Sequence, residues 1–339
     1  MLGKLIPLAQ EYAAVEPHVD WRYWFDRARG NLKWLLERVD RSTYDLLEIP
    51  LRWEIGDSTA SRSRTRIARR EMFYHDGPFL KRSDISLERE FAAPKIPFKR
   101  IARPRKILDV ILDTSAVRYR ELWGFTYPDA AHVYHAGFGR GVDFYFFGVP
   151  REWRLPLRAY HGAMFFKNGV PIGYFEGLSL FERMEAGFNL YYTFREGETA
   201  WLYAKILKIF REHLGVTCYS IDPYQLGHEN EEAIDSGAFW FYRKLGFRTT
   251  SPELRPLIAR EESRLAANRE YRTPAATLRK LATAPMIWGG GEEWDRFDLR
   301  DLPLFPQVAS GKDAPEERTY LRRMQKNRRV PRQTQQPRP

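Results

Sequence analysis

Apolar residues near the start of the chain change from a helical to an extended spacing. Between His18 and Val39, tryptophan, phenylalanine and leucine recur at intervals of three and four, which predicts an amphipathic helix. The following run LLEIPLRWEI alternates as a strand does and ends at Gly56-Asp57. Four prolines then predict loops or extended pieces up to the next helix, at Pro78, Pro94, Pro97 and Pro104.

The pattern in the middle of the chain predicts a series of strands. A helix that opens at Pro104 and runs towards Trp123 comes first, and AHVYHAG and VDFYFFGV predict two strands joined by a glycine-rich turn. HGAMFFK and VPIGYFEGLSLF predict two more strands, joined by a hairpin at Asn168-Gly169 because both positions tolerate positive φ. We interpret ERMEAG as a turn and FNLYYTFR as the third strand of an antiparallel meander.

After this meander the hydrophobic period changes from two to nearly four. The spacing predicts a helix over 200–210 that stops at Gly215, and VTCYSID predicts a strand. PYQLGHENEE is interpreted as a loop, and a second helix is expected over 231–245, closed by Gly246. In this β-β-β-α-β-α order, the last strand is expected to lie parallel to the third strand of the meander.

The remainder of the chain is expected to be mostly helical. Ser251-Pro252 and Thr273-Pro274 each predict a helix start, and Gly289-Gly290-Gly291 predicts an irregular end. The pattern divides the chain into an N-terminal helical and basic extension (1–104), a mixed domain (105–250), a helical C-terminal extension (251–306) and a disordered basic tail (307–339).

Charge is distributed unevenly along the 339 residues, whose formal net charge is +11. Residues 58–106 hold 14 lysines and arginines against 5 acids, and residues 307–339 hold 9 against 3, so the rest of the chain is slightly acidic. Basic segments of this kind bind nucleic acid or acidic membrane surfaces, or are simply solvated.

The hydrophobic content of 43% is ample for a core, and no run is long enough to span a membrane. The N-terminus makes a poor signal peptide, so we expect a cytoplasmic protein.

Several familiar catalytic patterns are excluded or weak. Cys218 is the single cysteine, which excludes an internal disulfide, and its place in a strand favours a buried thiol over a nucleophile. His132 and His135 have no evident third ligand, so no metal site is predicted. The glycines between 137 and 141 lack the spacing of a dinucleotide fingerprint.

A set of residues in the second predicted helix carries a family resemblance. Asp235, Ala238, Tyr242, Gly246 and Phe247 follow the spacing Asn-x-x-Ala-x-x-x-Tyr-x-x-x-Gly-Phe, with aspartate in place of asparagine. Together with the order of elements over about 160–247, this resembles the GNAT superfamily of acyl-CoA-dependent N-acyltransferases. The resemblance implies an α+β or α/β fold, with a mixed sheet and helices on both faces. It also implies acyl-CoA as cosubstrate.

The resemblance also implies where the acyl-CoA would bind. Its pyrophosphate would meet the loop and helix start formed by Arg195, Gly197, Thr199 and Ala200, where amides at a helix N-terminus face the phosphates. Its pantetheine arm would pair with the backbone of Leu190, Tyr191 and Tyr192 like an added strand. Glu198 stands where the family has its middle glycine. The departure leaves three readings: the loop bulges, the ligand is not CoA, or the site has lost its ligand.

Catalytic roles follow from the same resemblance and from the residue types. Tyr242 would protonate the departing thiolate, since a phenol is protonated at neutral pH. Asp235 would stand at the pantetheine arm, but an ionised carboxylate cannot donate a hydrogen bond there. As general base we select Glu176, an acid inside an aromatic strand whose burial would raise its pKa. The alternatives are Glu182, Glu185, His161 and His228.

The sequence therefore supports more than one function. The first is a divergent GNAT-fold acyltransferase that acts on an unidentified amine or anionic substrate, with aminoacyl-tRNA as a variant donor. The alternative is a GNAT-like binding protein without catalysis that contacts nucleic acid through 58–106 and the tail. A third is a protein that meets a protein partner through its aromatic surface. The oligomeric state does not follow from the sequence.

Overall fold

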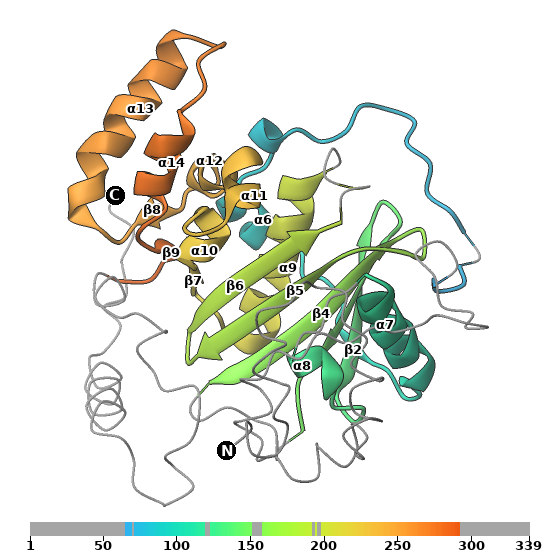
Figure 1. The fold of residues 1–339 in the computed structure, drawn as a ribbon. Coiled ribbons are helices and arrows are strands. Elements are labelled where there is room, and N and C mark those ends of the chain that lie inside the picture. Colours follow the sequence, from blue (N-terminus) through green and yellow to red (C-terminus); the bar gives the residue numbers. More distant parts are fainter. Residues whose placement is uncertain are drawn as a thin grey trace, which may run out of the picture. The chain divides into compact units, whose positions relative to one another are not determined.

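A nine-stranded sheet organises the described part of the chain (Figure 1). The computed structural model describes residues 65–69, 71–118, 123–150, 158–191, 194 and 198–291. The helix predicted at 18–39, the strand that ends at Gly56 and the basic tail lie outside these residues. The strand order is β1-β2-β3-β4-β5-β6-β7-β9-β8, and neighbouring strands are antiparallel except β6 and β7, which are parallel.

The strands are β1 (Lys99–Arg100), β2 (Val133–Gly139), β3 (Val142–Phe147), β4 (Ala159–Lys167), β5 (Val170–Leu180), β6 (Arg183–Leu190), β7 (Cys218–Ile221), β8 (Arg248–Thr249) and β9 (Met286–Gly289). The helices are η1 (Arg82–Asp84), α6 (Leu87–Ala92), α7 (Arg105–Val117), α8 (Trp123–Thr126), α9 (Thr199–Leu214), α10 (Pro223–Leu226), α11 (Glu231–Asp235), α12 (Ala238–Lys244), η4 (Pro252–Leu254), α13 (Arg255–Ala267) and α14 (Ala275–Leu281). None of these described helices combines the length and apolar character needed to cross a membrane.

The antiparallel meander is confirmed, but its second turn lies elsewhere than predicted. Asn168 and Gly169 form the predicted hairpin, with φ of 51° and 81°. The next turn is Phe181-Glu182, so ERMEAG belongs mostly to strand β6 and the prediction of a strand over 188–195 was wrong in its start. The charged residues of that segment suggested a turn, yet Arg183 is 1% exposed and its Nε donates to Ser220 Oγ at 3.1 Å. A buried hydroxyl therefore accepts a hydrogen bond from a guanidinium that the sequence pattern assigns to solvent.

Strands β6 and β7 are parallel, as the crossover rule predicts, but they pair over a short stretch only. Strand β6 pairs with β5 along its whole length, from Arg183 to Leu190. Its pairing with β7 joins only 183–185 to 218–220. In the described part of the chain, the second half of β6 therefore runs beyond the strand beside it.

The second predicted helix is divided into two. Helix α11 ends at Asp235 and α12 begins at Ala238, because Gly237 adopts a left-handed conformation with φ of 68°. A left-handed residue interrupts the helical hydrogen-bond ladder, and glycine adopts that conformation at least cost. The preceding segment, predicted as a loop, contains the short helix α10. The single helix over 231–245 was therefore an overextension.

The C-terminal part supplies a strand that the sequence pattern did not predict. Helices follow Ser251-Pro252 and Pro274 as expected. Strand β9, however, occupies the segment next to the expected irregular end and lies between β7 and β8. The sheet thus contains strands from both sides of the segment limits predicted at 104 and 250. Those limits stay predictions as domain boundaries.

Helices cover both faces of the sheet (Figure 1). Helix α9 lies at the centre of one apolar cluster, with ten buried residues against the strands. Helices α7 and α8 contribute to a second cluster, with Phe125 packed edge-on against Phe147 at 5.0 Å. The described architecture is therefore a mixed α/β layer structure with a mostly antiparallel sheet.

The basic segment 65–100 is folded against the sheet and α9. The amide of Ile67 donates to Gly169 O at 2.9 Å, and the Asn168 side chain forms two hydrogen bonds with the backbone of Phe73. Further along, the Leu80 amide donates to Glu198 Oε1 at 3.0 Å. These contacts hold Ile67 and Phe73 at the hairpin between β4 and β5 and place Leu80 at the start of α9.

Candidate functional site

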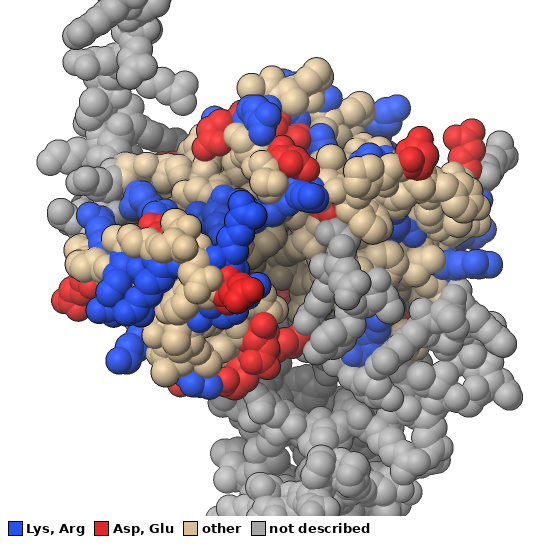
Figure 2. All heavy atoms as spheres, turned by 90° about the horizontal axis from the view of Figure 1, so that it is seen from above, with Lys and Arg blue, Asp and Glu red and all other residues tan. Residues whose placement is uncertain are grey.

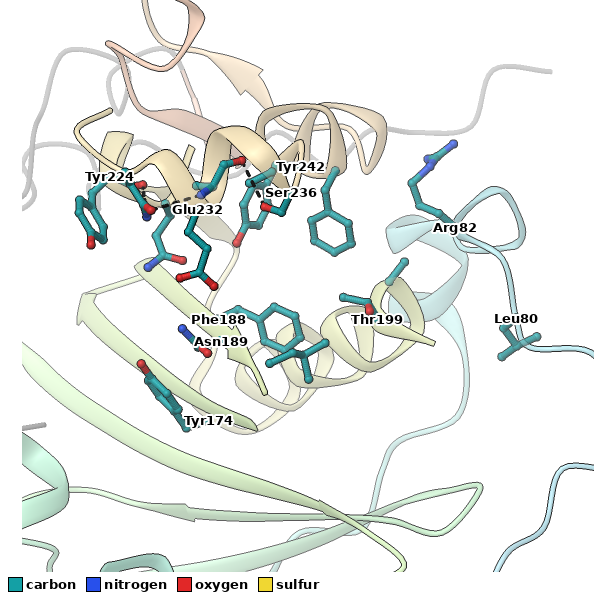
Figure 3. Close-up of a pocket in the computed structure, with 17 residues that line it drawn as sticks. Leu80, Arg82, Tyr174, Phe188, Asn189, Thr199, Tyr224, Glu232, Ser236 and Tyr242 are labelled. Atoms are coloured by element: carbon teal, nitrogen blue, oxygen red, sulfur yellow. Dashed lines mark hydrogen bonds between the residues drawn. The ribbon is translucent and has the colours of Figure 1, made fainter. Parts of the chain in front are cut away.

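A cavity of about 490 Å³ lies where β6 extends past β7 (Figure 3). Its walls come from the end of β6 (188–190), the start of α9 (199–200), the helices α10 to α12, and Leu80 and Arg82 of the basic segment. Figure 2 shows a hollow in the face seen from above, with lysine and arginine side chains on one side of it. The sequence brings these walls together because β7 leads directly into α10 and α11.

One end of the cavity is the N-terminus of α9. Thr199 and Ala200, both predicted site residues, form its first turn and line the cavity. The helix has 16 residues, and the first amides of an α-helix lie beyond the reach of its internal hydrogen-bond ladder. These amides and the helix dipole favour an anion at this end. The other predicted residues of this loop, Arg195 and Gly197, lie outside the described residues.

Glu198, which departs from the family pattern, is neutralised by a neighbour. Its carboxylate accepts from Arg140 Nε at 2.9 Å, forms an ion pair with Arg140 Nη2 at 2.6 Å, and accepts from the Leu80 amide. Burial acts to raise the pKa of Glu198, but the hydrogen bonds from Arg140 and Leu80 lower it overall. The carboxylate therefore carries a compensated charge at the helix start.

Tyr242 projects from α12 towards the middle of the cavity (Figure 3). It is 3% exposed, and its ring packs edge-on against Tyr203 at 5.6 Å and Phe247 at 5.8 Å. Burial raises the pKa of the Tyr242 hydroxyl far above its usual range. The phenol thus stays protonated at neutral pH. Ala238, one turn earlier on α12, lines the same cavity.

Asp235 is not brought to this cavity. It is exposed at the last position of α11, and the left-handed Gly237 separates it from α12. Among the described lining residues, Ser236 takes the neighbouring position. The motif register therefore holds for Ala238 and Tyr242 but not for the residue before the helix break.

The predicted strand edge is placed in part. Leu190 lines the cavity. Tyr191 is 7% exposed, its amide donates to Ile172 O at 2.9 Å, and its ring packs in the cluster of α7 and α8. Tyr192 lies outside the described residues. The second half of β6 therefore supplies the edge, and Tyr191 turns away from it.

Glu176 lies in β5, on the face that also carries Tyr174. Tyr160 donates its hydroxyl to Glu176 Oε1 at 2.5 Å. Burial raises the pKa of Glu176, while this hydrogen bond opposes the rise. Its partners in the sheet register are Gly162 and Gly187, and the Phe147 ring occupies the space beside Gly162. Tyr174 lines the cavity; Glu176 is not among its described lining residues, and no described contact joins it to Tyr242.

The alternative bases and metal ligands have other roles. His161 is buried and bonded to Ser179 at 2.6 Å, and burial lowers the pKa of its imidazole to about 4. His228 is exposed after α10. His132 and His135 each pair with a single aspartate. The described residues contain no cluster of three or more histidine, cysteine, aspartate or glutamate side chains placed for a metal.

Glu182 and Glu185 complete the alternatives and also stand apart from the cavity. Glu182 is the second residue of the turn before β6, and its carbonyl accepts from the amides of Thr217 and Cys218. Glu185 is the last residue of β6 that pairs with β7. Neither is among the described lining residues.

The structure adds polar residues that the sequence did not single out. Arg82 reaches the cavity rim, where its Nη1 donates to Lys244 O at 2.6 Å. Asn189 faces Tyr174 across the β5–β6 register, and Glu232 directs its carboxylate into the cavity (Figure 3). Among these residues, only Asn189 could have been noticed in the sequence, as a polar residue inside an aromatic strand. Arg82 and Glu232 are distant in sequence, and only the fold brings both of them to the cavity.

Comparisons with known proteins do not assign this chain to a family. A scan against protein-family models, a search of curated proteins and a search of solved structures each returned no match. The chemistry of the site therefore follows from the chain's own residues.

Proposed function

We propose that the protein is an acyl-CoA-dependent N-acyltransferase. The observation that carries the proposal is a single cavity with a helix N-terminus at one end and the buried Tyr242 hydroxyl inside it. A phosphate-bearing thioester needs both features: amide donors for its phosphates and a proton donor for its leaving group.

Each part of the donor has a counterpart in the cavity walls. The first turn of α9 would bind the phosphates, and the guanidinium of Arg82 at the rim would add a positive charge. The second half of β6 would hydrogen-bond the pantetheine amides along its length, in the manner of an added strand. Neutralisation of Glu198 by Arg140 removes the repulsion that its charge would impose on the phosphates.

The reaction then requires two proton transfers. The amine nitrogen attacks the thioester carbonyl, a C–N bond forms, and the C–S bond breaks with its electron pair on sulfur. Tyr242 donates its proton to that thiolate and regains one from solvent. Glu176, whose pKa burial raises, accepts the proton that the amine loses. The amine would approach over the face of β5 that carries Tyr174 and Glu176.

The proposal is tested by comparing binding with turnover. Titration calorimetry should detect acetyl-CoA, and Tyr242→Phe should keep that affinity while thiol release with a panel of amines falls by about 10²–10⁴-fold. Tyr224→Phe is the matched control, because Tyr224 lines the same cavity but is 55% exposed. It should keep both binding and turnover. Absence of heat and of any thermal shift at millimolar CoA would contradict the proposal.

The alternative is nucleic-acid binding through 58–106 and the C-terminal tail, and it gains little support from the described part of the first segment. Several arginines of this segment are already engaged within the chain. Arg69 pairs with Asp143 at 2.9 Å, Arg82 donates to Lys244 O, and Arg100 donates to Ala131 O. The alternative stays a prediction, and steep salt dependence of RNA or DNA binding would support it.

A further inference from the structure

A second cavity, of about 350 Å³, is also lined by the start of α9. Most of its wall is apolar: Val142, Ile172, Leu190, Phe194, Trp201 and Leu202. It shares Leu190 and Thr199 with the first cavity but is not lined by Tyr242 or Arg82. Its volume lies within the range of small-molecule sites.

The polar lining of this cavity is Lys167 from the end of β4, His75 from the basic segment, and Glu198 and Thr199 at the start of α9, where Arg140 pairs with the Glu198 carboxylate. Lys167 Nζ donates to Arg140 O at 2.6 Å, lies 3.3 Å from His75 Nε2, and stands 4.6 Å from the centre of the Phe73 ring. The ammonium is thus held between aromatic rings and backbone, at the edge of an apolar space.

The carboxylates around Lys167 are already engaged by arginines. Asp143 pairs with Arg69, and Glu198 pairs with Arg140. No carboxylate among the described residues forms an ion pair with Lys167, so the cluster carries one cation in excess. Burial lowers the pKa of Lys167, and Arg140 and Arg69 lower it further, while Glu198 opposes them. A bound anion would supply the missing counter-charge.

His75 lies between two cationic hydrogen-bond donors and cannot accept from both. Its Nδ1 lies 3.3 Å from Arg140 Nη2, and its Nε2 lies 3.3 Å from Lys167 Nζ. A neutral imidazole has one acceptor nitrogen only, so it cannot accept from both cations at once. The cluster therefore contains more donors than acceptors, and an acceptor placed beside Lys167 would correct the balance.

We propose that this second cavity binds a small apolar carboxylic acid, with its carboxylate at Lys167 and His75 and its body among the apolar walls. A single excess cation matches a monoanion. A phosphate dianion would carry one negative charge more than the single excess cation balances, and an amine would meet Lys167 with like charge. The two groups proposed to transfer protons, Tyr242 and Glu176, do not line this cavity, although it shares Leu190 and Thr199 with the first.

Titration calorimetry with octanoate tests the proposal. Octanoate should bind the full chain, while octanol and octylamine should bind at least tenfold more weakly. Lys167→Met should weaken octanoate at least tenfold, and Ile172→Phe, which fills the cavity, should do the same. Arg82→Met is the matched control, since it removes a cation from the first cavity only, and it should leave the octanoate affinity unchanged.

Three results would overturn the proposal. They are no octanoate binding at millimolar concentration, equal binding of octanol, or an octanoate affinity that depends on Arg82 rather than Lys167. The thermal unfolding curve of Lys167→Met checks that the variant is folded. Because none of these readouts uses acyl-CoA, failure here is distinct from failure of the acyltransferase proposal.

Discussion

A single ion pair decides whether the start of α9 can receive an anion. Glu198 stands at the position before the first turn, and an uncompensated carboxylate there would repel phosphate. Arg140 reaches it from the β2–β3 turn, with φ of 49° at that arginine. The sequence left three interpretations of a glutamate at position 198, and compensation by an arginine was not one of them. Arg140 lies 58 positions away in the chain, so the sequence pattern does not connect the two residues.

At the same scale, Glu176 should give the protein a pH-dependent stability. Burial raises its pKa in the folded state, so its contribution to stability is full below the unfolded pKa, about 4.3. That contribution is lost as the pH rises through the raised folded pKa. Glu176→Gln cannot ionise, so its free energy of unfolding relative to wild type should increase between pH 4 and pH 7. Urea unfolding at a series of pH values measures the difference.

The control for Glu176 is Glu253→Gln, which changes an exposed carboxylate before α13. Its unfolding free energy should run parallel to that of wild type across the same pH range. A parallel course for Glu176→Gln as well would show that the buried carboxylate does not change its protonation on folding.

At the scale of elements, a buried lysine fastens the basic segment to the sheet layer. Lys208 of α9 is fully buried, and its Nζ donates to Glu90 O at 2.5 Å and Ala93 O at 2.7 Å. It also pairs with Glu212 at 3.2 Å. Lys208→Met would remove the lysine donor of the Ala93 carbonyl and the positive partner of the buried Glu212 carboxylate, and the expected loss of stability is about 3–5 kcal/mol.

Lys205→Met is the matched control for this contact. Lys205 lies on the same helix and pairs with the side chain of Glu90 at 2.7 Å, but both groups are partly exposed. Its removal should cost no more than about 1 kcal/mol, since exposed ion pairs contribute little. Urea unfolding of both variants measures the two costs, and equal costs would contradict the anchoring role of Lys208.

Elements whose signals are local were predictable, and elements that depend on distant partners were not. Asn168-Gly169, the period of α9 and Pro104 each act within a few residues, so the hairpin and both helices α7 and α9 were found. The shifted turn at Phe181 depends on Arg183 reaching Ser220, and the break at Gly237 has no stronger signal than any glycine in a helix. Within the candidate site, Tyr242 and Ala200 were implied by the family resemblance, whereas Arg82 and Glu232 were not.

At the scale of the whole molecule, three remote segments meet beside β7. Trp288 of β9 lies 5.0 Å from Phe91 of α6 and 6.2 Å from Tyr219 of β7, measured between ring centres. Strand β9 pairs with β7 across about 70 positions of sequence, a separation over which loop closure opposes pairing. Its four residues carry no periodic signal of their own. The C-terminal segment 286–289 is therefore an integral part of the sheet that bounds the first cavity.

This arrangement predicts that a change in β9 destabilises the sheet as a whole. Gly289 has φ of 71°, and an added Cβ would lie 2.3 Å from Thr217 O, so Gly289→Ala should cost at least about 1–2 kcal/mol from the left-handed conformation alone. Gly77→Ala, at an exposed position with open space, is the control and should change little. Hydrogen exchange of amides in β4 and β5 measures the effect. Because β9 and the meander form one sheet, we expect faster exchange in β4 and β5, by an amount that matches the loss of unfolding free energy in urea. Faster exchange confined to 286–289 would instead mean that this segment unfolds independently of the sheet.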